Sequence, residues 1–194
     1  MRWLSRGAAV GALLALLAAC APKPSFQNVD ITGADYARSF DLTDFNGQRR
    51  TLADFKGDVV AVFFGYTQCP DVCPTSLAEL AQVKQALGAD GKRLQVVFIS
   101  LDPERDTPAV LKAYLANFDK AAVGLYGTPQ QTAQVAKEFK VFYQKVPGST
   151  PGSYTVDHTA GSYVFDPQGR VRLFARYGAD PKALLGDVKQ LLGS

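Results

Sequence analysis

The sequence predicts an α/β fold with a central mixed β-sheet, helices on both faces of the sheet and a β-hairpin near the N-terminus. Two observations predict this fold. Apolar runs rich in β-branched and aromatic residues alternate with helical segments over residues 59–139, which is typical of strands joined by helices. Residues 141–192 then carry short strands, a hairpin turn and a last helix. With 194 residues, 47% of them apolar, the chain can form one full core, so we expect one domain and exclude disordered and fibrous proteins.

The first predicted elements are a hairpin and a central strand. Residues 40–45 and 49–52 flank Asn46-Gly47, a dipeptide that readily takes the left-handed dihedrals of a tight turn. Residues 59–66 (VVAVFFGY) form a continuous apolar run, as expected for a strand covered on both faces. A helix is predicted over residues 74–87, and Gly88 is placed to end it.

The later elements repeat the alternation. Residues 94–101 (LQVVFISL) predict a second buried strand. Asp106-Thr107-Pro108 supplies capping side chains and then a proline for the first turn of a helix. The remaining predicted elements are a helix at 108–118, a strand at 123–126, a helix at 129–139, strands at 141–146, 162–166 and 170–176, and a helix at 181–192.

The N-terminus has the pattern of an export signal. Arg2 and Arg6 form a cationic start before an uncharged apolar run at residues 7–19. This run is shorter than the roughly 20 apolar residues of a membrane helix and fits the core of a signal peptide. It ends at Cys20 in a pattern (LAAC) that resembles a bacterial lipobox, where a cysteine receives diacylglycerol before cleavage. An uncleaved anchor or ordinary signal cleavage nearby are the alternatives.

These features predict three segments and a location. We expect a lipoprotein signal peptide at residues 1–19, the lipidated Cys20 with a flexible tether at 20–36, and the folded domain at 37–194. The domain would be exported and held at a membrane by lipid, facing the periplasm or another extracytoplasmic space. The formal net charge is +3 with no run of five like charges, so nucleic acid is not an expected partner.

Two cysteines carry the strongest chemical signal. Cys69 and Cys73 lie between the predicted central strand and the next helix. The N–H groups and the positive dipole end of a helix N-terminus favour thiolate over thiol. The three intervening residues place the sulfurs one helical turn apart, where they can form a disulfide or bind one ion. A purely structural disulfide is less favoured, because closing so small a loop restricts the unfolded chain little.

His158 and Asp102 are further candidates. His158 is the only histidine. A lone histidine is more often a surface or core residue than a ligand, although a dithiol elsewhere favours function. Asp102 follows the second buried strand, and if the two buried strands are parallel neighbours, it approaches the cysteines at the sheet edge where ligands bind. The alternative is a solvated loop carboxylate paired with Arg105.

From about residue 40 to 192 the chain resembles the SCO/SenC family, thioredoxin-fold proteins that handle copper for assembly of the dinuclear copper centre of cytochrome c oxidase. The resemblance rests on FFGYT at 63–67 leading into CPDVCP at 69–74, on residues 102–108, and on Asp157-His158-Thr159. It implies a thioredoxin-like fold. It also implies one copper ion per chain, bound by Cys69, Cys73 and His158, with Asp102 nearby as a residue that affects the copper site. The implied partners are an upstream copper donor and the oxidase subunit that carries the dinuclear site.

Competing functions remain open from the sequence. Two thiolates and an imidazole suit Cu(I) and can also hold Cu(II), which fits a metallochaperone that is not itself an enzyme. Zinc is a rival ion if a carboxylate completes a tetrahedron. The main alternative is a thiol-disulfide oxidoreductase in which Cys69 attacks and Cys73 resolves, with His158 dispensable. A redox or copper sensor has no specific sequence support. HExxH, P-loop, GxGxxG and GxSxG motifs are absent.

Overall fold

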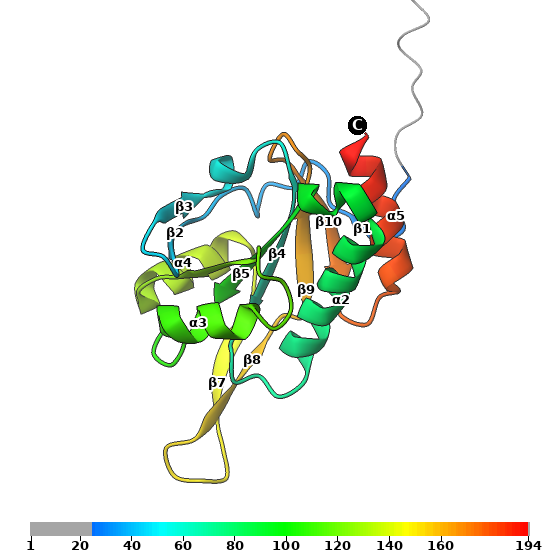
Figure 1. Ribbon diagram of the computed structural model, residues 1–194. Helices are drawn as coiled ribbons and strands as arrows, with labels where there is room; N and C mark the ends of the chain where they lie inside the picture. The colour runs from blue at the N-terminus through cyan, green and yellow to red at the C-terminus, as the bar shows by residue number, and fades with distance from the viewer. Residues whose placement is uncertain (1–24, 194) are drawn as a thin grey trace, which may run out of the picture.

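The computed structural model describes residues 25–193 and has a mixed β-sheet at its centre (Figure 1). Within this part of the chain, the sheet order is β1-β10-β9-β4-β5-β6-β2-β3, and β7 and β8 form a separate two-stranded sheet. The strands are β1 (Val29–Asp30), β2 (Asp41–Asp44), β3 (Arg49–Thr51), β4 (Val59–Gly65), β5 (Leu94–Ser100), β6 (Val123–Tyr126), β7 (Tyr143–Pro147), β8 (Tyr154–His158), β9 (Gly161–Phe165) and β10 (Val171–Arg176). The α-helices are α2 (Val72–Ala86), α3 (Pro108–Leu115), α4 (Pro129–Glu138) and α5 (Pro181–Leu192).

The centre of the sheet is parallel and its flanks are antiparallel. β4 pairs with β5, and β5 pairs with β6, in parallel register. β9 lies on the other side of β4 and runs antiparallel to it. Every residue of β4 is buried, which explains its uninterrupted apolar sequence. The predicted mixed sheet is therefore confirmed.

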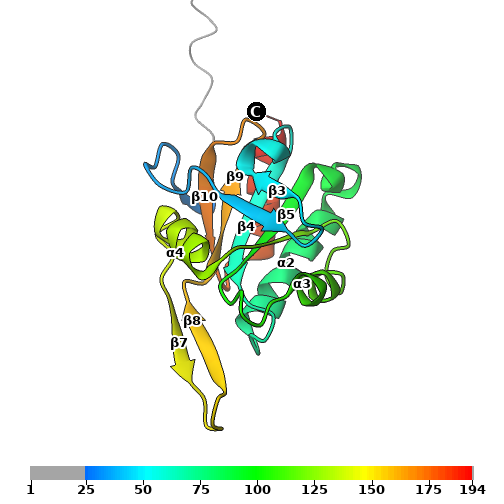
Figure 2. The same cartoon turned by 90° about the vertical axis from the view of Figure 1, so that its left-hand side faces the viewer.

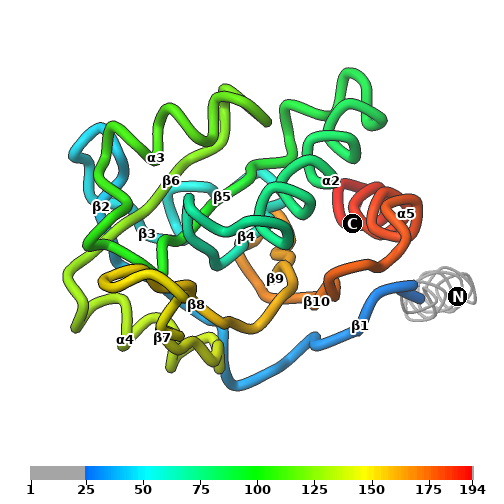
Figure 3. Tube along the Cα trace, turned by 90° about the horizontal axis from the view of Figure 1, so that it is seen from below, coloured from blue at the N-terminus to red at the C-terminus, as the bar shows by residue number. Residues whose placement is uncertain are grey.

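Helices cover both faces of the sheet, as predicted. α4 lies on one face, and α2, α3 and α5 lie on the other (Figures 2 and 3). Successive residues of β4 point to opposite faces, so Phe64 packs on Phe139 at the end of α4 while Phe63 packs on Phe98. Phe98 in turn contacts Tyr114 of α3. The core thus has two apolar layers, one on each face of the sheet, and β4 contributes side chains to both.

The N-terminal hairpin is also confirmed. β2 and β3 pair antiparallel around Asn46-Gly47, and Gly47 has a φ of 82°, in the left-handed region that glycine favours. On its other edge, β2 pairs with β6. The hairpin therefore extends the sheet past its parallel centre.

The start of the described chain differs from the expected tether. Residues 1–24, with the predicted signal peptide and the lipidation site Cys20, lie outside the described residues. Residues 25–36 pack on the body, because β1 pairs with β10 and the buried carboxylate of Asp187 accepts hydrogen bonds from Gln27 and Asn28. The sequence did not indicate this packing, because a strand of two residues and a set of polar contacts produce no periodic pattern of apolar residues.

β7 and β8 form a hairpin that projects from the body (Figures 1 and 2). Residues 141–146 were expected to be a strand, but β8 was not expected. None of the helices among residues 25–193 combines the length and apolar character needed to cross a bilayer.

Candidate metal centre

Three potential metal ligands meet at the carboxyl end of β4. Among the described residues, Cys69 Sγ, Cys73 Sγ and a ring nitrogen of His158 all lie within 4.8 Å of one another. Cys73 Sγ is 3.5 Å from His158 Nε2. The structure therefore brings together the three residues that the sequence singled out, although 85 positions separate Cys73 from His158.

The two cysteines are positioned by a loop and a helix start. The Cys69 N–H donates to the carbonyl of Tyr66, which closes a turn after β4. Cys73 is the second residue of α2, which begins two residues before its predicted start. The Cys73 N–H donates to Cys69 Sγ at 3.3 Å. The N–H of Cys73, which has no acceptor within the helix because it lies in the first turn, thus points at the sulfur of Cys69.

Gly65 makes room for the buried sulfur. Cys73 is fully buried, and a Cβ on Gly65 would lie 2.8 Å from its Sγ. The same Cβ would lie 2.9 Å from the ring of Phe63. Any side chain at this last position of β4 would displace the sulfur or the ring.

His158 presents one ring nitrogen to the thiols. It is the last residue of β8, and its Nδ1 lies 3.0 Å from the carbonyl oxygen of Thr159. A carbonyl only accepts, so Nδ1 carries a hydrogen, and Nε2 is the ring nitrogen that faces the thiols. Phe63 and Tyr66 hold the ring edge-on, with ring centroids 6.1 and 6.2 Å away. Nε2 is thus oriented as a metal ligand would be.

The two thiols have opposite acidities. A hydrogen bond from the Cys73 thiol is the largest cause that lowers the pKa of Cys69, to about 4, against the opposing effect of burial. The same hydrogen bond and burial raise the pKa of Cys73. Near neutral pH the pair therefore shares one proton, with a thiolate at Cys69 and a thiol at Cys73.

This donor set fits one soft metal ion. Metal–sulfur and metal–nitrogen bonds of about 2.0–2.3 Å place donor atoms about 3.5–4.5 Å apart. The observed spread of up to 4.8 Å needs little adjustment to match this. Two sulfurs and one imidazole favour copper over harder ions.

Asp102 is not among the donors. The parallel pairing of β4 with β5 places it at the same sheet edge, as predicted, and it is fully buried. Its Oδ1 accepts from the hydroxyl of Tyr154 at 2.8 Å, and its Oδ2 accepts from Nε of Arg105. The alternative prediction, a solvated carboxylate paired with Arg105, was right about Arg105 but wrong about solvation, because Asp102 is buried. Asp102, the carboxylate that could have completed a tetrahedral zinc site, therefore binds Tyr154 and Arg105 instead.

Asp106 is a contributor that the sequence did not assign to the site. It was expected to help cap α3, but Thr107 provides the cap and Asp106 points inward. Its carboxylate accepts from the hydroxyls of Thr67 and Ser100, both at 2.6 Å. Because Thr67 is two residues before Cys69, Asp106 fastens the loop that carries the first sulfur. Its position next to a cap made it look like a capping residue.

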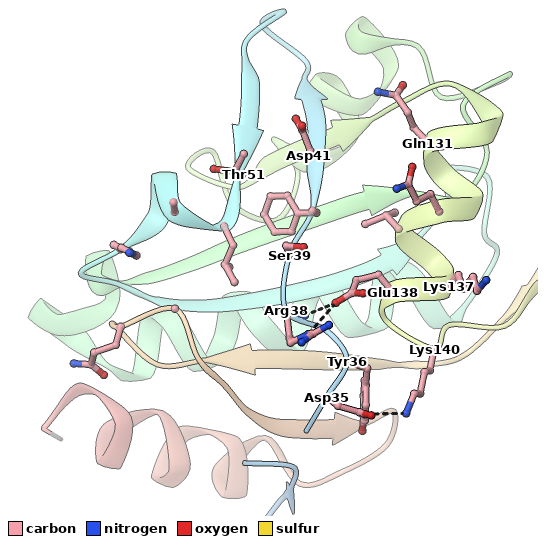
Figure 4. Close-up of a pocket in the computed structure, with 18 residues that line it drawn as sticks. Asp35, Tyr36, Arg38, Ser39, Asp41, Thr51, Gln131, Lys137, Glu138 and Lys140 are labelled. Carbon is pink, nitrogen blue, oxygen red and sulfur yellow. Dashed lines mark hydrogen bonds and ion pairs between the residues drawn. The ribbon is translucent and has the colours of Figure 1, made fainter. Parts of the chain in front are cut away.

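A separate groove lies away from this centre. It has a volume of about 990 Å³ and runs between residues 35–41, the short helix η2 (Leu52–Phe55) and α4 (Figure 4). Four of the charged groups that line it form two ion pairs, Glu138 with Arg38 and Lys140 with Asp35. Cys69, Cys73 and His158 do not line it.

Comparison with known proteins identifies the family. The family model described as SCO1/SenC matches residues 29–193. The chain belongs to the SCO1/SenC family. A SCO2-like protein of Rickettsia felis is 36% identical over 184 residues, which cover 93% of this chain and 90% of the relative.

Solved SCO1/SenC structures share the fold and include copper-bound forms. ScoI of Bradyrhizobium japonicum with copper bound is 45% identical, covers 79% of this chain and 98% of its own, and has a TM-score of 0.72. Yeast Sco1 with copper bound is 32% identical, covers 88% of this chain and 90% of its own, and has a TM-score of 0.73. The thioredoxin-like fold implied by the sequence is therefore confirmed.

Proposed function

We propose that this protein is a copper chaperone that binds one copper ion through Cys69, Cys73 and His158 and delivers it to the dinuclear copper centre of cytochrome c oxidase. The convergence of these three donor atoms within 4.8 Å carries the proposal. The copper-bound SCO1/SenC relatives support the identity of the ion.

The acidities and burial of the thiols suit loading and transfer. Copper needs both sulfurs as thiolates, and Cys69 already is one near neutral pH, so binding displaces the proton of Cys73. Cys69 is partly exposed, whereas Cys73 is buried. An acceptor protein can therefore approach copper from the Cys69 side and replace the ligands one at a time.

The remaining partners and the location belong to the same proposal. We propose an upstream copper donor, the oxidase subunit with the dinuclear site as acceptor, and attachment to a membrane through lipid on Cys20 after removal of residues 1–19. The folded domain would then work in the periplasm or another extracytoplasmic space. The described chain enters the body on the side away from the β7–β8 hairpin, which supports an outward-facing metal centre (Figure 1).

Copper titration tests the proposal. The reduced protein should bind about one copper ion per chain, with X-ray absorption counting two sulfur neighbours and one nitrogen neighbour. His158→Ala should weaken binding and the sulfur-to-Cu(II) charge-transfer band. Asp157→Asn changes the adjacent, exposed residue and is the matched control, expected to behave as wild type. Unchanged affinity and spectrum in His158→Ala would overturn the ligand set.

A thiol-disulfide oxidoreductase is the second candidate, and the contrast between the thiols favours it. The Cys69 thiolate can attack a target disulfide, forming a mixed disulfide and releasing one target thiolate. Cys73 then gives its proton to the first target thiolate and attacks Cys69 Sγ, which releases the second target thiolate and leaves a Cys69–Cys73 disulfide. An external thiol reductant must return the two electrons for each turnover.

One variant separates the two functions. His158→Ala should keep reductase turnover on a model disulfide if thiol exchange is the main role, and cells carrying it should still assemble oxidase. If copper transfer is the main role, that variant should lose oxidase assembly whatever its reductase rate.

A further inference from the structure

The hairpin that carries His158 is held to the body near its outer part. Tyr154 starts β8 and His158 ends it, so the strand links a contact away from the metal centre to the metal ligand itself. Val156, between them, is buried against the body. Whatever sets the position of β8 therefore sets the distance between the imidazole and the thiols.

Tyr154 makes three contacts with two residues of the body. Its hydroxyl donates to Oδ1 of the buried Asp102 at 2.8 Å. Its ring lies under the guanidinium of Arg105, 3.6 Å from centroid to Cζ. Its carbonyl accepts from Arg105 Nη1 at 3.0 Å. The hydroxyl, the ring and the backbone are thus all engaged.

Arg105 connects this contact to the cysteine loop. Its Nε pairs with Asp102, and its Nη1 also donates to the side chain of Gln68 at 3.0 Å, next to Cys69. Its guanidinium also approaches the ring of Tyr66, 5.7 Å from the centroid. One side chain therefore touches the hairpin, the end of β5 and the loop of the first sulfur.

We propose that Tyr154, Asp102 and Arg105 form a latch in which Tyr154 is a positioning residue: it holds the hairpin so that His158 stays on the copper, and it sets how fast copper leaves. This inference rests on the proposed function. The sulfurs and the imidazole stand on different elements, so movement of the hairpin removes the nitrogen and leaves copper on the two sulfurs alone. Cu(I) is then open to an acceptor, with no change in oxidation state.

A neighbouring contact provides a matched control. Lys145 of β7 pairs with Glu104 at 2.7 Å, but both side chains are largely exposed. Exposed ion pairs contribute little, because solvent screens them and long side chains lose freedom. Lys145 also lies over the ring of Tyr154, 4.6 Å from the centroid. Glu104→Gln therefore disturbs the same junction while leaving Tyr154, Asp102 and Arg105 themselves unchanged.

The first measurement needs no metal. Because His158 is the only histidine, its imidazole gives the only histidine ring signals in the NMR spectrum of the full chain. Tyr154→Phe removes one hydroxyl and keeps the ring over Arg105. We expect it to shift or broaden these signals, because the ring moves relative to Phe63 and Tyr66, whereas Glu104→Gln leaves them unchanged. Arg105→Lys is the second latch variant, should Tyr154→Phe fail to fold.

The second measurement follows release of Cu(I) from the loaded full chain to bathocuproine disulfonate. Tyr154→Phe should release copper about tenfold faster than wild type, since a hydrogen bond to a carboxylate contributes at least that factor. Unchanged release, with or without altered ring signals, would overturn the latch, and so would an equal effect of Glu104→Gln. A wild-type protein that binds no copper would refute the proposed function, while the ring signals would still test the latch.

Discussion

Cys69 and Cys73 have the same side chain but different surroundings, and those surroundings give them different chemistry. Cys69 receives an N–H from the start of α2 and a hydrogen bond from the second thiol. Cys73 is fully buried beside Gly65 and keeps its proton. The accessible sulfur is therefore the reactive one.

We expect iodoacetamide to modify one cysteine at about pH 6, because thiolates react and the pKa of Cys69 is about 4. Because the pKa of Cys69 is lowered, the reaction rate should stay high as the pH falls through 8 and 7 and should drop only near pH 4. Mass spectrometry should find one adduct on Cys69 and none on the buried Cys73. Cys69→Ser is the control. A rate that halves near pH 8.5, as for an ordinary thiol, would contradict this prediction.

Gly65→Ala should both destabilise the protein and weaken copper binding, because the added methyl group meets Cys73 Sγ at 2.8 Å. Overpacking of this kind costs about 1–3 kcal/mol of unfolding free energy. Gly127→Ala is the matched control, since its methyl group meets the side chains of Leu42 at 2.8 Å and Gln131 at 2.9 Å instead of a thiol. Denaturant melts should show a loss in both variants, and copper affinity should fall only in Gly65→Ala. Equal affinities would show that the sulfur position tolerates the change.

At the scale of elements, two hairpin turns repeat one arrangement. In β2–β3 the carboxylate of Asp44 accepts from the N–H groups of Asn46 and Gln48 and from the side chain of Arg50. In β9–β10 the buried Asp166 makes the corresponding contacts with the N–H groups of Gln168 and Arg170 and with the side chain of Arg172. A glycine with positive φ follows three residues after each aspartate. Both turns thus share the pattern D-x-[NQ]-G-x-x-R.

Asp166→Asn should lower the unfolding free energy by about 2–3 kcal/mol, because hydrogen bonds to a buried charge are lost. Burial acts to raise the pKa of Asp166, but hydrogen bonds from Arg170 and Arg172 outweigh it and leave the pKa below its usual range. This contribution is therefore full above about pH 4 and lost as the pH falls through the folded pKa. Denaturant melts from pH 7 to 3 should show a smaller acid loss in Asp166→Asn than in wild type. Asp90→Asn, on an exposed pair, should match wild type.

Elements whose apolar pattern is continuous could be predicted from the sequence, and those held by polar contacts could not. β4 and β5 are buried nearly throughout, so their runs predicted both strands. β8 alternates in burial, but it has only five residues and only Val156 is buried, so its pattern was too short and too polar to predict a strand. The cysteine pair is local and its spacing was informative. The approach of His158 depends on how the hairpin is held, which no local pattern records.

At the scale of the whole molecule, Asp187 joins the start of the described chain to its last helix. Its buried carboxylate on α5 accepts from the N–H groups of Gln27 and Asn28 at 2.9 and 2.8 Å. It also accepts from the Asn28 side chain. Beside this contact β1 pairs with β10 at the edge of the sheet. The chain therefore joins the body at a defined point.

Asp187→Ala should speed amide hydrogen exchange at Gln27 and Asn28 by about tenfold or more, because both N–H groups lose their acceptor. Exchange in β4 should change little, because the core strands open only with the whole protein. Gln190→Ala is the control: it removes a contact with the Ser25 carbonyl from an exposed residue of the same helix. Unchanged exchange at both amides in Asp187→Ala would show that β1 alone secures this segment.

The placement of this junction, on the side away from the β7–β8 hairpin, has a mechanical result (Figure 1). A domain that is attached at one end can rotate about the attachment, and its opposite end then moves through the largest volume of solvent. Under the proposed lipid attachment and copper delivery, the metal centre would lie on the leading surface, and an acceptor could reach it without rotation of the whole domain.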